Sequence, residues 1–207
     1  TNLEEKSMAL NDYIKSSLDN YIKVYDDVLP ATVVGSMIRW FNTCKFKPGL
    51  IGGSRQNPQG KLDEKIRNVQ TKPLVNLGES LTEAHWCNVL NNIFSKAMEQ
   101  YKMDTRIADM GAARITTIEA LKYEVGGHYD FHVDHFAATP RTMSMILLCN
   151  NDYQGGELGF ANPDRTGELL VPVRPGRLII WPSNFLFPHG VKPIKQGTRY
   201  SVVGWAL

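Results

Sequence analysis

After residue 110 the chain is a series of short runs rich in Ile, Val, Thr, Leu and Tyr, each ending near Gly or Pro. The runs cover residues 114–125, 129–134, 142–149, 168–173, 177–181 and 198–206. No helical periodicity separates one run from the next. Strands that follow one another without crossover helices pair antiparallel and form a sandwich, barrel or jelly roll. We therefore expect a mainly β core in this half of the chain.

The front half carries helical periodicity instead. Apolar residues recur every three or four positions in Ala31–Cys44 and again in 86–101, where Ser80 and Glu83 precede the repeat at capping-box spacing. Leu10–Leu18 has a weaker pattern of the same kind. These segments predict helices packed on one face of the sheet, which makes the expected fold class α+β.

The length of 207 residues favours one domain. We expect a single domain over 1–207, with a helix-rich support region at 1–110 and a β-rich core at 111–207. Gly49–Lys72 lacks periodicity and is interpreted as a long mobile loop that contacts substrate.

Charge and apolar content exclude several classes. A formal net charge of +2 gives no strong field for nucleic acid or a membrane surface, so neither is an expected partner. The most apolar stretch, 143–149, is far shorter than the ~20 residues that cross a bilayer. The first residues lack a basic region followed by an apolar core, and the three cysteines form no CxxC motif. These features predict a cytoplasmic protein with reduced thiols.

The segment YEVGGHYDFHVDHF, residues 123–136, contains the most informative pattern. His132 and Asp134 are two apart on an expected strand, so both project to one face and can hold one metal ion. His189, in a later strand-rich region, can supply a third ligand. Two imidazoles and one carboxylate with open positions are typical of non-haem Fe(II) oxygenases. Zinc is the competing metal, although no cysteine lies nearby.

Two further residues point to a bound carboxylate. Arg199 and Ser201 share a strand face in GTRYSVVGW and offer a bidentate cation beside a hydroxyl group. His128 and His135 flank the metal motif and are expected to be non-ligands.

Four ordered segments resemble a known family. They are VYDDVLP, YEVGGHYDFHVDHF, RTMSMILLCNNDYQGGELGF and VRPGRLIIWPSNFLFPHGVKPIKQGTRYSVVGW. The chain resembles the 2-oxoglutarate and Fe(II)-dependent oxygenases, specifically the prolyl 4-hydroxylase-like branch. The resemblance implies a double-stranded β-helix, also called a jelly roll.

The resemblance also implies roles for individual residues. His132, Asp134 and His189 would bind Fe(II), and Arg199 would pair with the distal carboxylate of 2-oxoglutarate. Ser201 and Tyr123 would complete the cosubstrate pocket. The implied chemistry consumes O₂ and 2-oxoglutarate, proceeds by a ferryl mechanism, releases succinate and CO₂, and uses ascorbate as reductant.

The substrate implied by this branch is a prolyl residue in a peptide or protein. Hydroxylation of another amino-acid side chain or of a small molecule is the alternative within the same chemistry. A non-enzymatic jelly-roll binding module, a nucleobase demethylase and a zinc hydrolase are the remaining alternatives. The sequence leaves the oligomeric state open.

Overall fold

The computed structural model describes residues 18–52, 60–75, 80–107, 109–111, 114–162 and 166–207. In chain order the elements are β1 (Lys23–Tyr25), α2 (Ala31–Phe41), β2 (Lys47–Pro48), β3 (Arg67–Asn68), β4 (Gln70–Pro73), α3 (Leu81–Thr105), β5 (Ile115–Tyr123), β6 (His128–His132), β7 (Met143–Leu148), β8 (Gln154–Gly155), β9 (Leu158–Ala161), β10 (Glu168–Val171), β11 (Arg177–Pro182), β12 (His189–Val191), β13 (Ile194–Gln196) and β14 (Arg199–Ala206).

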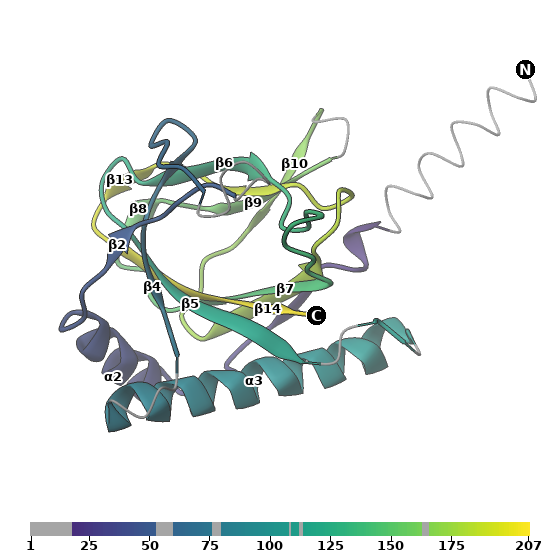
Figure 1. The fold of residues 1–207 in the computed structure, drawn as a ribbon, viewed down its shortest axis with the longest axis horizontal. Helices are drawn as coiled ribbons and strands as arrows, with labels where there is room; N and C mark the ends of the chain where they lie inside the picture. Colours follow the sequence, from purple (N-terminus) through teal and green to yellow (C-terminus); the bar gives the residue numbers. More distant parts are fainter. Residues whose placement is uncertain (1–17, 53–59, 76–79, 108, 112–113, 163–165) are drawn as a thin grey trace, which may run out of the picture.

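Two antiparallel sheets face each other and enclose the interior of a barrel. Among the described residues, the larger sheet has seven strands in the order β1-β11-β7-β14-β5-β4-β2. The smaller one has five strands in the order β10-β9-β12-β6-β3, and β13 pairs separately with β8. Figure 1 shows the sheets on opposite sides of the barrel, with α2 and α3 across the outer face of the larger sheet. The predicted α+β jelly roll with helices on one sheet is confirmed.

The long helix α3 begins where the capping motif predicts. The Ser80 hydroxyl accepts a hydrogen bond from the Glu83 backbone N–H at 3.2 Å. The Glu83 carboxylate is not turned back toward Ser80. It accepts from the Lys72 ammonium on β4 at 3.0 Å and also from the Val75 N–H. The start of α3 is therefore tied to the edge region of the large sheet.

An apolar core lies between the helices and the large sheet. The Phe94 side chain on α3 is fully buried against Gly204 on β14. A Cβ atom at position 204 would lie 2.7 Å from the Phe94 ring, so glycine is what allows the helix and the strand to approach so closely. Tyr101, at the far end of the same helix, is also fully buried and donates to the Tyr21 carbonyl at 2.9 Å.

A second apolar cluster lies between the two sheets. It includes Tyr123 on β5, Phe160 on β9 and Trp181 on β11. Phe160 and Trp181 meet edge to face, with ring centroids 5.0 Å apart. This cluster forms the walls of the barrel interior, which remains open at one end.

The six predicted strand runs all contain strands, and both stronger helix predictions are confirmed. The interpretation of Gly49–Lys72 as a structureless loop is wrong for its second half. Strands β3 and β4 lie largely within it, and Ile51 forms an isolated bridge with Lys61. These strands are short and gain their hydrogen bonds from β5 and β6, so local periodicity does not mark them. The helix predicted over Leu10–Leu18 falls, apart from Leu18, outside the described residues.

No helix among the described residues combines the length and the apolar character needed to span a lipid bilayer.

Candidate metal centre and its cavity

A cavity of about 460 Å³ lies between the two sheets. Its walls come from β5 and β14 of the large sheet and from β6 and β12 of the small one. The cavity lining includes His132, Asp134 and His189, together with Tyr123 and Trp181. The three predicted metal ligands therefore meet in a cavity between the two sheets.

Strand pairing brings the two histidines together. His132 is the last residue of β6 and His189 the first of β12, and the two are direct partners in the antiparallel register. Each Nδ1 faces a backbone carbonyl, that of Asp130 at 2.9 Å for His132 and that of Phe187 at 3.1 Å for His189. A carbonyl only accepts, so each Nδ1 carries the hydrogen and each Nε2 keeps a free lone pair.

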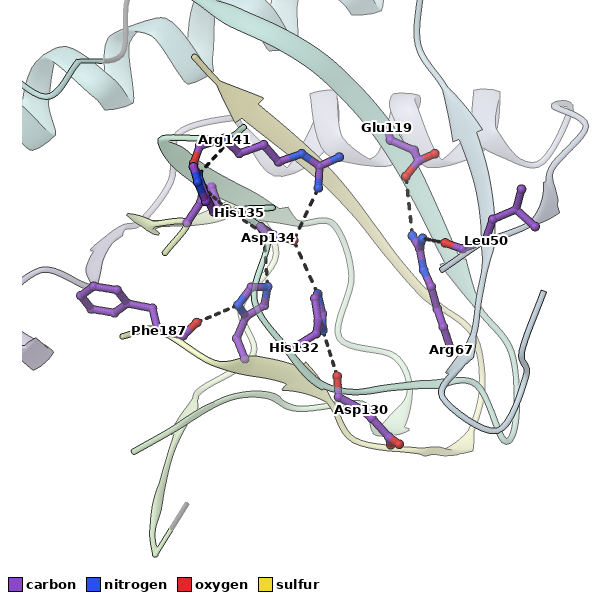
Figure 2. Close-up of polar contacts among 12 residues, drawn as sticks. Leu50, Arg67, Glu119, Asp130, His132, Asp134, His135, Arg141 and Phe187 are labelled. Carbon is purple, nitrogen blue, oxygen red and sulfur yellow. Dashed lines mark hydrogen bonds and ion pairs between the residues drawn. The ribbon is translucent and has the colours of Figure 1, made fainter. Parts of the chain in front are cut away.

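Asp134 lies just past the end of β6 and faces both imidazoles. Its Oδ1 is 3.6 Å from the His132 Nε2, and its Oδ2 is 3.3 Å from the His189 Nε2. One ligand atom from each of the three residues lies within 4.8 Å of the others, a grouping that can hold a metal ion. Figure 2 shows Asp134 between the His132 ring and the Arg141 guanidinium.

Two buried serines hold the carboxylate in place. The Ser144 hydroxyl donates to the Asp134 Oδ2 at 2.7 Å and is itself 2.7 Å from the Ser183 hydroxyl. The Asp134 backbone N–H donates to the Ser183 carbonyl at 3.2 Å. These contacts tie the carboxylate to Ser144 on β7 and to Ser183 just after β11, which is how supporting contacts commonly orient metal ligands.

Burial and charge act on the ionisation of this group in opposite directions. Burial by itself would raise the pKa of Asp134, but the attraction of His189 and the contacts of both rings with the carboxylate, which become charge-assisted hydrogen bonds when the rings are protonated, outweigh it. They hold the pKa of Asp134 well below its usual range. Burial, together with the nearby His189, lowers the pKa of His132. A charged carboxylate beside a neutral imidazole is the protonation state that a metal ion requires.

The flanking histidines are held elsewhere. His128 contacts the carbonyls of Gly126 and Lys65 through its two ring nitrogens. His135 is exposed, and its Nδ1 lies 2.8 Å from the Arg141 carbonyl. Neither belongs to the metal-binding group found among the described residues.

Arg199 lies at the inner end of the barrel with donors that have no partner. It is fully buried, and its Nη1 donates to the Ser201 hydroxyl at 2.9 Å. Its Nε and Nη2 find no hydrogen-bond partner, and neither does the buried hydroxyl of Tyr153. Tyr123 is the register partner of Arg199, and the guanidinium carbon is 5.1 Å from its ring centroid. Burial raises the pKa of Tyr123, so its phenol remains protonated.

These residues fit an Fe(II) ion and a dicarboxylate. Two imidazole nitrogens and one carboxylate oxygen, with no cysteine among them, are a donor set that suits iron and leaves part of the coordination sphere to other groups. A buried arginine with unpartnered donors is costly unless a ligand accepts from it. Arg199 therefore has the chemistry needed for one carboxylate of 2-oxoglutarate.

An antiparallel double-stranded β-helix with a His-Asp-His cluster inside it defines a class of metal-binding proteins. Residues 118–207 match the model of the 2OG-Fe(II) oxygenase superfamily. The matched part contains the metal-binding cluster and Arg199, so the similarity to that superfamily includes the site itself.

Two curated relatives each match 44% of this chain. A PKHD-type hydroxylase of Crocosphaera subtropica is 34% identical over 98 residues, which are 44% of this chain and 42% of that protein. A PKHD-type hydroxylase of Synechococcus sp. (strain CC9902) is 36% identical over 96 residues, 44% of this chain and 41% of that protein. The chain thus spans about two fifths of the length of the curated relatives it matches.

Solved structures share the fold over most of the chain. A prolyl-4-hydroxylase of Pseudomonas putida superimposes with a TM-score of 0.64 and 22% identity, covering 90% of this chain and 92% of that one. A prolyl hydroxylase of Trichoplax adhaerens, in complex with a hypoxia inducible factor peptide fragment, gives a TM-score of 0.69 and 18% identity, covering 100% and 93%. The N-terminal helices are therefore part of the shared architecture.

Several residues around the metal centre and its cavity were not predicted from the sequence. They are Ser144 and Ser183, which hold Asp134, and Arg67 and Glu119, which line the cavity. A signal exists for two of them. Ser144 interrupts an apolar run, and Glu119 occupies the same strand phase as Tyr123 with buried residues on both sides of it in the chain. Polar residues at such positions require a partner or a ligand.

Proposed function

We propose that this chain is a 2-oxoglutarate- and O₂-dependent oxygenase that uses Fe(II) to hydroxylate a prolyl residue in a peptide or protein. One observation carries the proposal. The His132–Asp134–His189 group and the unpartnered donors of Arg199 lie inside the same barrel. A metal hydrolase would need the first of these features but would have no use for the second.

The metal ligands in this proposal are His132 Nε2, His189 Nε2 and an Asp134 carboxylate oxygen. The bound iron and its cosubstrate supply the oxidising power for C–H hydroxylation, which side chains alone lack. The protein keeps the two Nε2 atoms unprotonated through the carbonyls that hold each Nδ1. Ser144 restrains the carboxylate so that it does not rotate away from the histidines.

Arg199 and Ser201 bind the distal carboxylate of 2-oxoglutarate in this proposal, and Tyr123 forms the wall beside it. The strand register supports the assignment because Arg199 and Tyr123 are cross-strand partners on the barrel side of the large sheet. Burial of the guanidinium excludes competing water and strengthens its hydrogen bonds to a charged acceptor.

The prolyl substrate is supported by the fold shared with the two prolyl hydroxylases and by the motifs of that branch in the sequence. We also propose that residues 1–207 form a single domain. The reductant in the same proposal is ascorbate. We place the protein in the cytoplasm because Cys44, Cys87 and Cys149 are all free thiols, as expected in a reducing compartment.

The test is conversion of 2-oxoglutarate to succinate in the presence of Fe(II), O₂ and ascorbate, with a panel of proline-containing peptides analysed by mass spectrometry. The expected result is a gain of one oxygen on proline in step with succinate formation. Succinate formed with a different oxidised acceptor would keep the oxygenase and replace the substrate. No succinate and no binding of 2-oxoglutarate would overturn the proposal.

Asp134→Ala supplies the matching loss of function. It removes the only carboxylate of the metal-binding group, so we expect Fe(II) binding and turnover to fall below detection. His85→Ala, on the exposed face of α3, is the control that also removes a metal-binding side-chain type. Calorimetric titration with Fe(II) under argon separates lost metal binding from lost chemistry. Equal iron affinity in Asp134→Ala and wild type would contradict the ligand assignment.

A further inference from the structure

The two ends of the barrel face of the large sheet carry different chemistry. In the register of β14 with β5, Arg199 pairs with Tyr123 at one end, Val203 with Glu119 further along, and Trp205 with a threonine near the other end. Six residues separate Arg199 from Trp205, a distance of roughly 20 Å along a strand. The end near Trp205 is therefore too remote to belong to the pocket around Arg199.

Arg141 is a guanidinium with unused donors at this second end. Its guanidinium carbon lies 3.6 Å from the centroid of the Trp205 ring, a stacking contact that fixes the plane of the group. Its Nη1 is 3.6 Å from the Asp134 Oδ1, beyond hydrogen-bond distance, and the side chain is only 22% exposed. Among the described residues the guanidinium donates no hydrogen bond, although it borders the cavity.

Arg67, on β3 of the small sheet, is a second cation that lines the same cavity, and its hydrogen-bond donors are also incompletely satisfied. Its Nη1 donates to the Leu50 carbonyl, whereas its Nη2 is 3.7 Å from the Glu119 Oε2 and its buried Nε has no partner. Figure 2 shows Arg67 between Leu50 and Glu119. The guanidinium carbon is 4.8 Å from the centroid of the Tyr129 ring, which stacks in turn on His132.

Counting charges gives a surplus at this end of the cavity. Arg67 and Arg141 are the two largely desolvated cations, whereas Lys47 of the same lining is exposed, and Glu119 is the carboxylate that faces both arginines. At the other end, an Fe(II) ion, the Asp134 carboxylate, the 2-oxoglutarate dianion and Arg199 sum formally to zero. One largely desolvated positive charge is therefore left over. A charged oxygen ligand relieves such a charge far better than a neutral carbonyl does.

We propose that Arg141 and Arg67 bind a carboxylate of the substrate, and that this carboxylate belongs to the residue that is hydroxylated. The substrate class is then a peptide or protein whose C-terminal residue is the proline that is hydroxylated. The position of Arg141 supports the second point, since its Nη1 lies within 3.6 Å of a proposed metal ligand. A substrate carboxylate that Arg141 binds therefore lies within the length of one residue from the metal ion. This inference rests on the proposed function and names its substrate more narrowly.

The test compares two probes that differ only in this group, N-acetyl-L-proline and N-acetyl-L-prolinamide. Binding to the protein loaded with Fe(II) and 2-oxoglutarate is measured by ligand-observed NMR under argon, so that no turnover is needed. The expected result is that the carboxylate binds roughly tenfold or more tightly than the amide, as for a charged hydrogen bond. Equal affinities, or no binding of either probe by protein that does bind 2-oxoglutarate, would overturn the inference.

Variants then assign the preference to the arginines. Arg141→Gln should abolish the preference for the carboxylate, and Arg141→Lys should restore part of it. Glu119→Gln should increase the preference, because it removes the competing negative charge. Lys122→Gln removes a cation of β5 that pairs with Glu124 outside the cavity and should leave the preference as in wild type.

The 2-oxoglutarate affinity of each sample is measured in parallel. An Arg141→Gln variant that binds 2-oxoglutarate normally and still prefers the carboxylate would overturn the inference alone. Wild-type protein that binds Fe(II) but not 2-oxoglutarate would overturn the proposed function instead.

Discussion

The two faces of the large sheet differ in whether their buried polar atoms have hydrogen-bond partners. On the face that packs against the helices, the Tyr101 hydroxyl donates to the Tyr21 carbonyl at 2.9 Å, and the Tyr200 hydroxyl donates to Asn42 at 2.7 Å. On the barrel side, the described residues include buried donors and hydroxyls with no partner. They belong to Arg67, Tyr153, Trp181, Arg199 and Trp205.

This difference indicates that the helix side of the sheet provides stability and that the barrel side provides binding. A buried polar group without a partner costs about 1–3 kcal/mol, so a face that collects several of them lowers the stability of the fold. None of these unpartnered atoms in the described part of the chain lies on the helix-side face, which provides apolar burial centred on residues such as Phe94, Met37 and Leu90. The barrel side therefore depends on the other face for its stability and keeps its donors available for ligands.

The largest expected effect is on the helix side. Phe94→Ala removes a fully buried ring from its contact with Gly204, and such truncations cost about 3–5 kcal/mol of unfolding free energy. Urea denaturation measures the loss. Affinity for Fe(II), measured where the variant is still folded, should match that of wild type. A variant that keeps its stability, or that loses metal affinity in proportion, would remove the distinction between the two faces.

An intermediate effect is expected for Arg199→Met on the barrel side. A hydrogen bond to a charged group contributes about 1.5–3 kcal/mol, so 2-oxoglutarate should bind roughly 10- to 150-fold more weakly in calorimetric titrations. The unfolding free energy should stay the same or increase, because an apolar side chain replaces a buried charge with unpartnered donors. Strong destabilisation with unchanged 2-oxoglutarate affinity would mean that Arg199 serves the fold.

The smallest effect concerns the charge of Glu119. Burial, partly offset by the attraction of Arg67, raises the pKa of this carboxyl above its ordinary value of 4.5. The folded protein therefore holds the proton more tightly than the unfolded chain does. The resulting destabilisation is absent below about pH 4.5 and complete above the raised pKa.

Glu119→Gln should accordingly be slightly more stable than wild type at pH 7. The advantage should shrink as the pH falls through the raised pKa toward 4.5. Thermal or urea unfolding across this pH range measures it. An advantage that does not change with pH would show that the ionisation of Glu119 is not its source.

Sequence patterns predicted the framework because the framework depends on local periodicity. The alternation in 114–125 corresponds to β5, and the Ser80–Glu83 spacing marks the start of α3. The short strands β9 and β12 were not predicted. Each has four residues or fewer, and the two pair with each other although they lie far apart in the chain. Such strands are defined by their pairing and carry little local signal.

The same distinction between local sequence signals and long-range pairing applies to the site. The sequence by itself determined the residue types, a His-x-Asp pair with a later histidine and an arginine, because metal and carboxylate chemistry admits few side chains. Only the tertiary structure decided that His132 and His189 are cross-strand partners and that Ser144 and Ser183 hold the carboxylate between them. It also gathered Arg67, Glu119 and Arg141 from three separate segments around one cavity. The physical reason is that strand register and sheet closure set these distances, and both depend on hydrogen bonds between residues far apart in the chain.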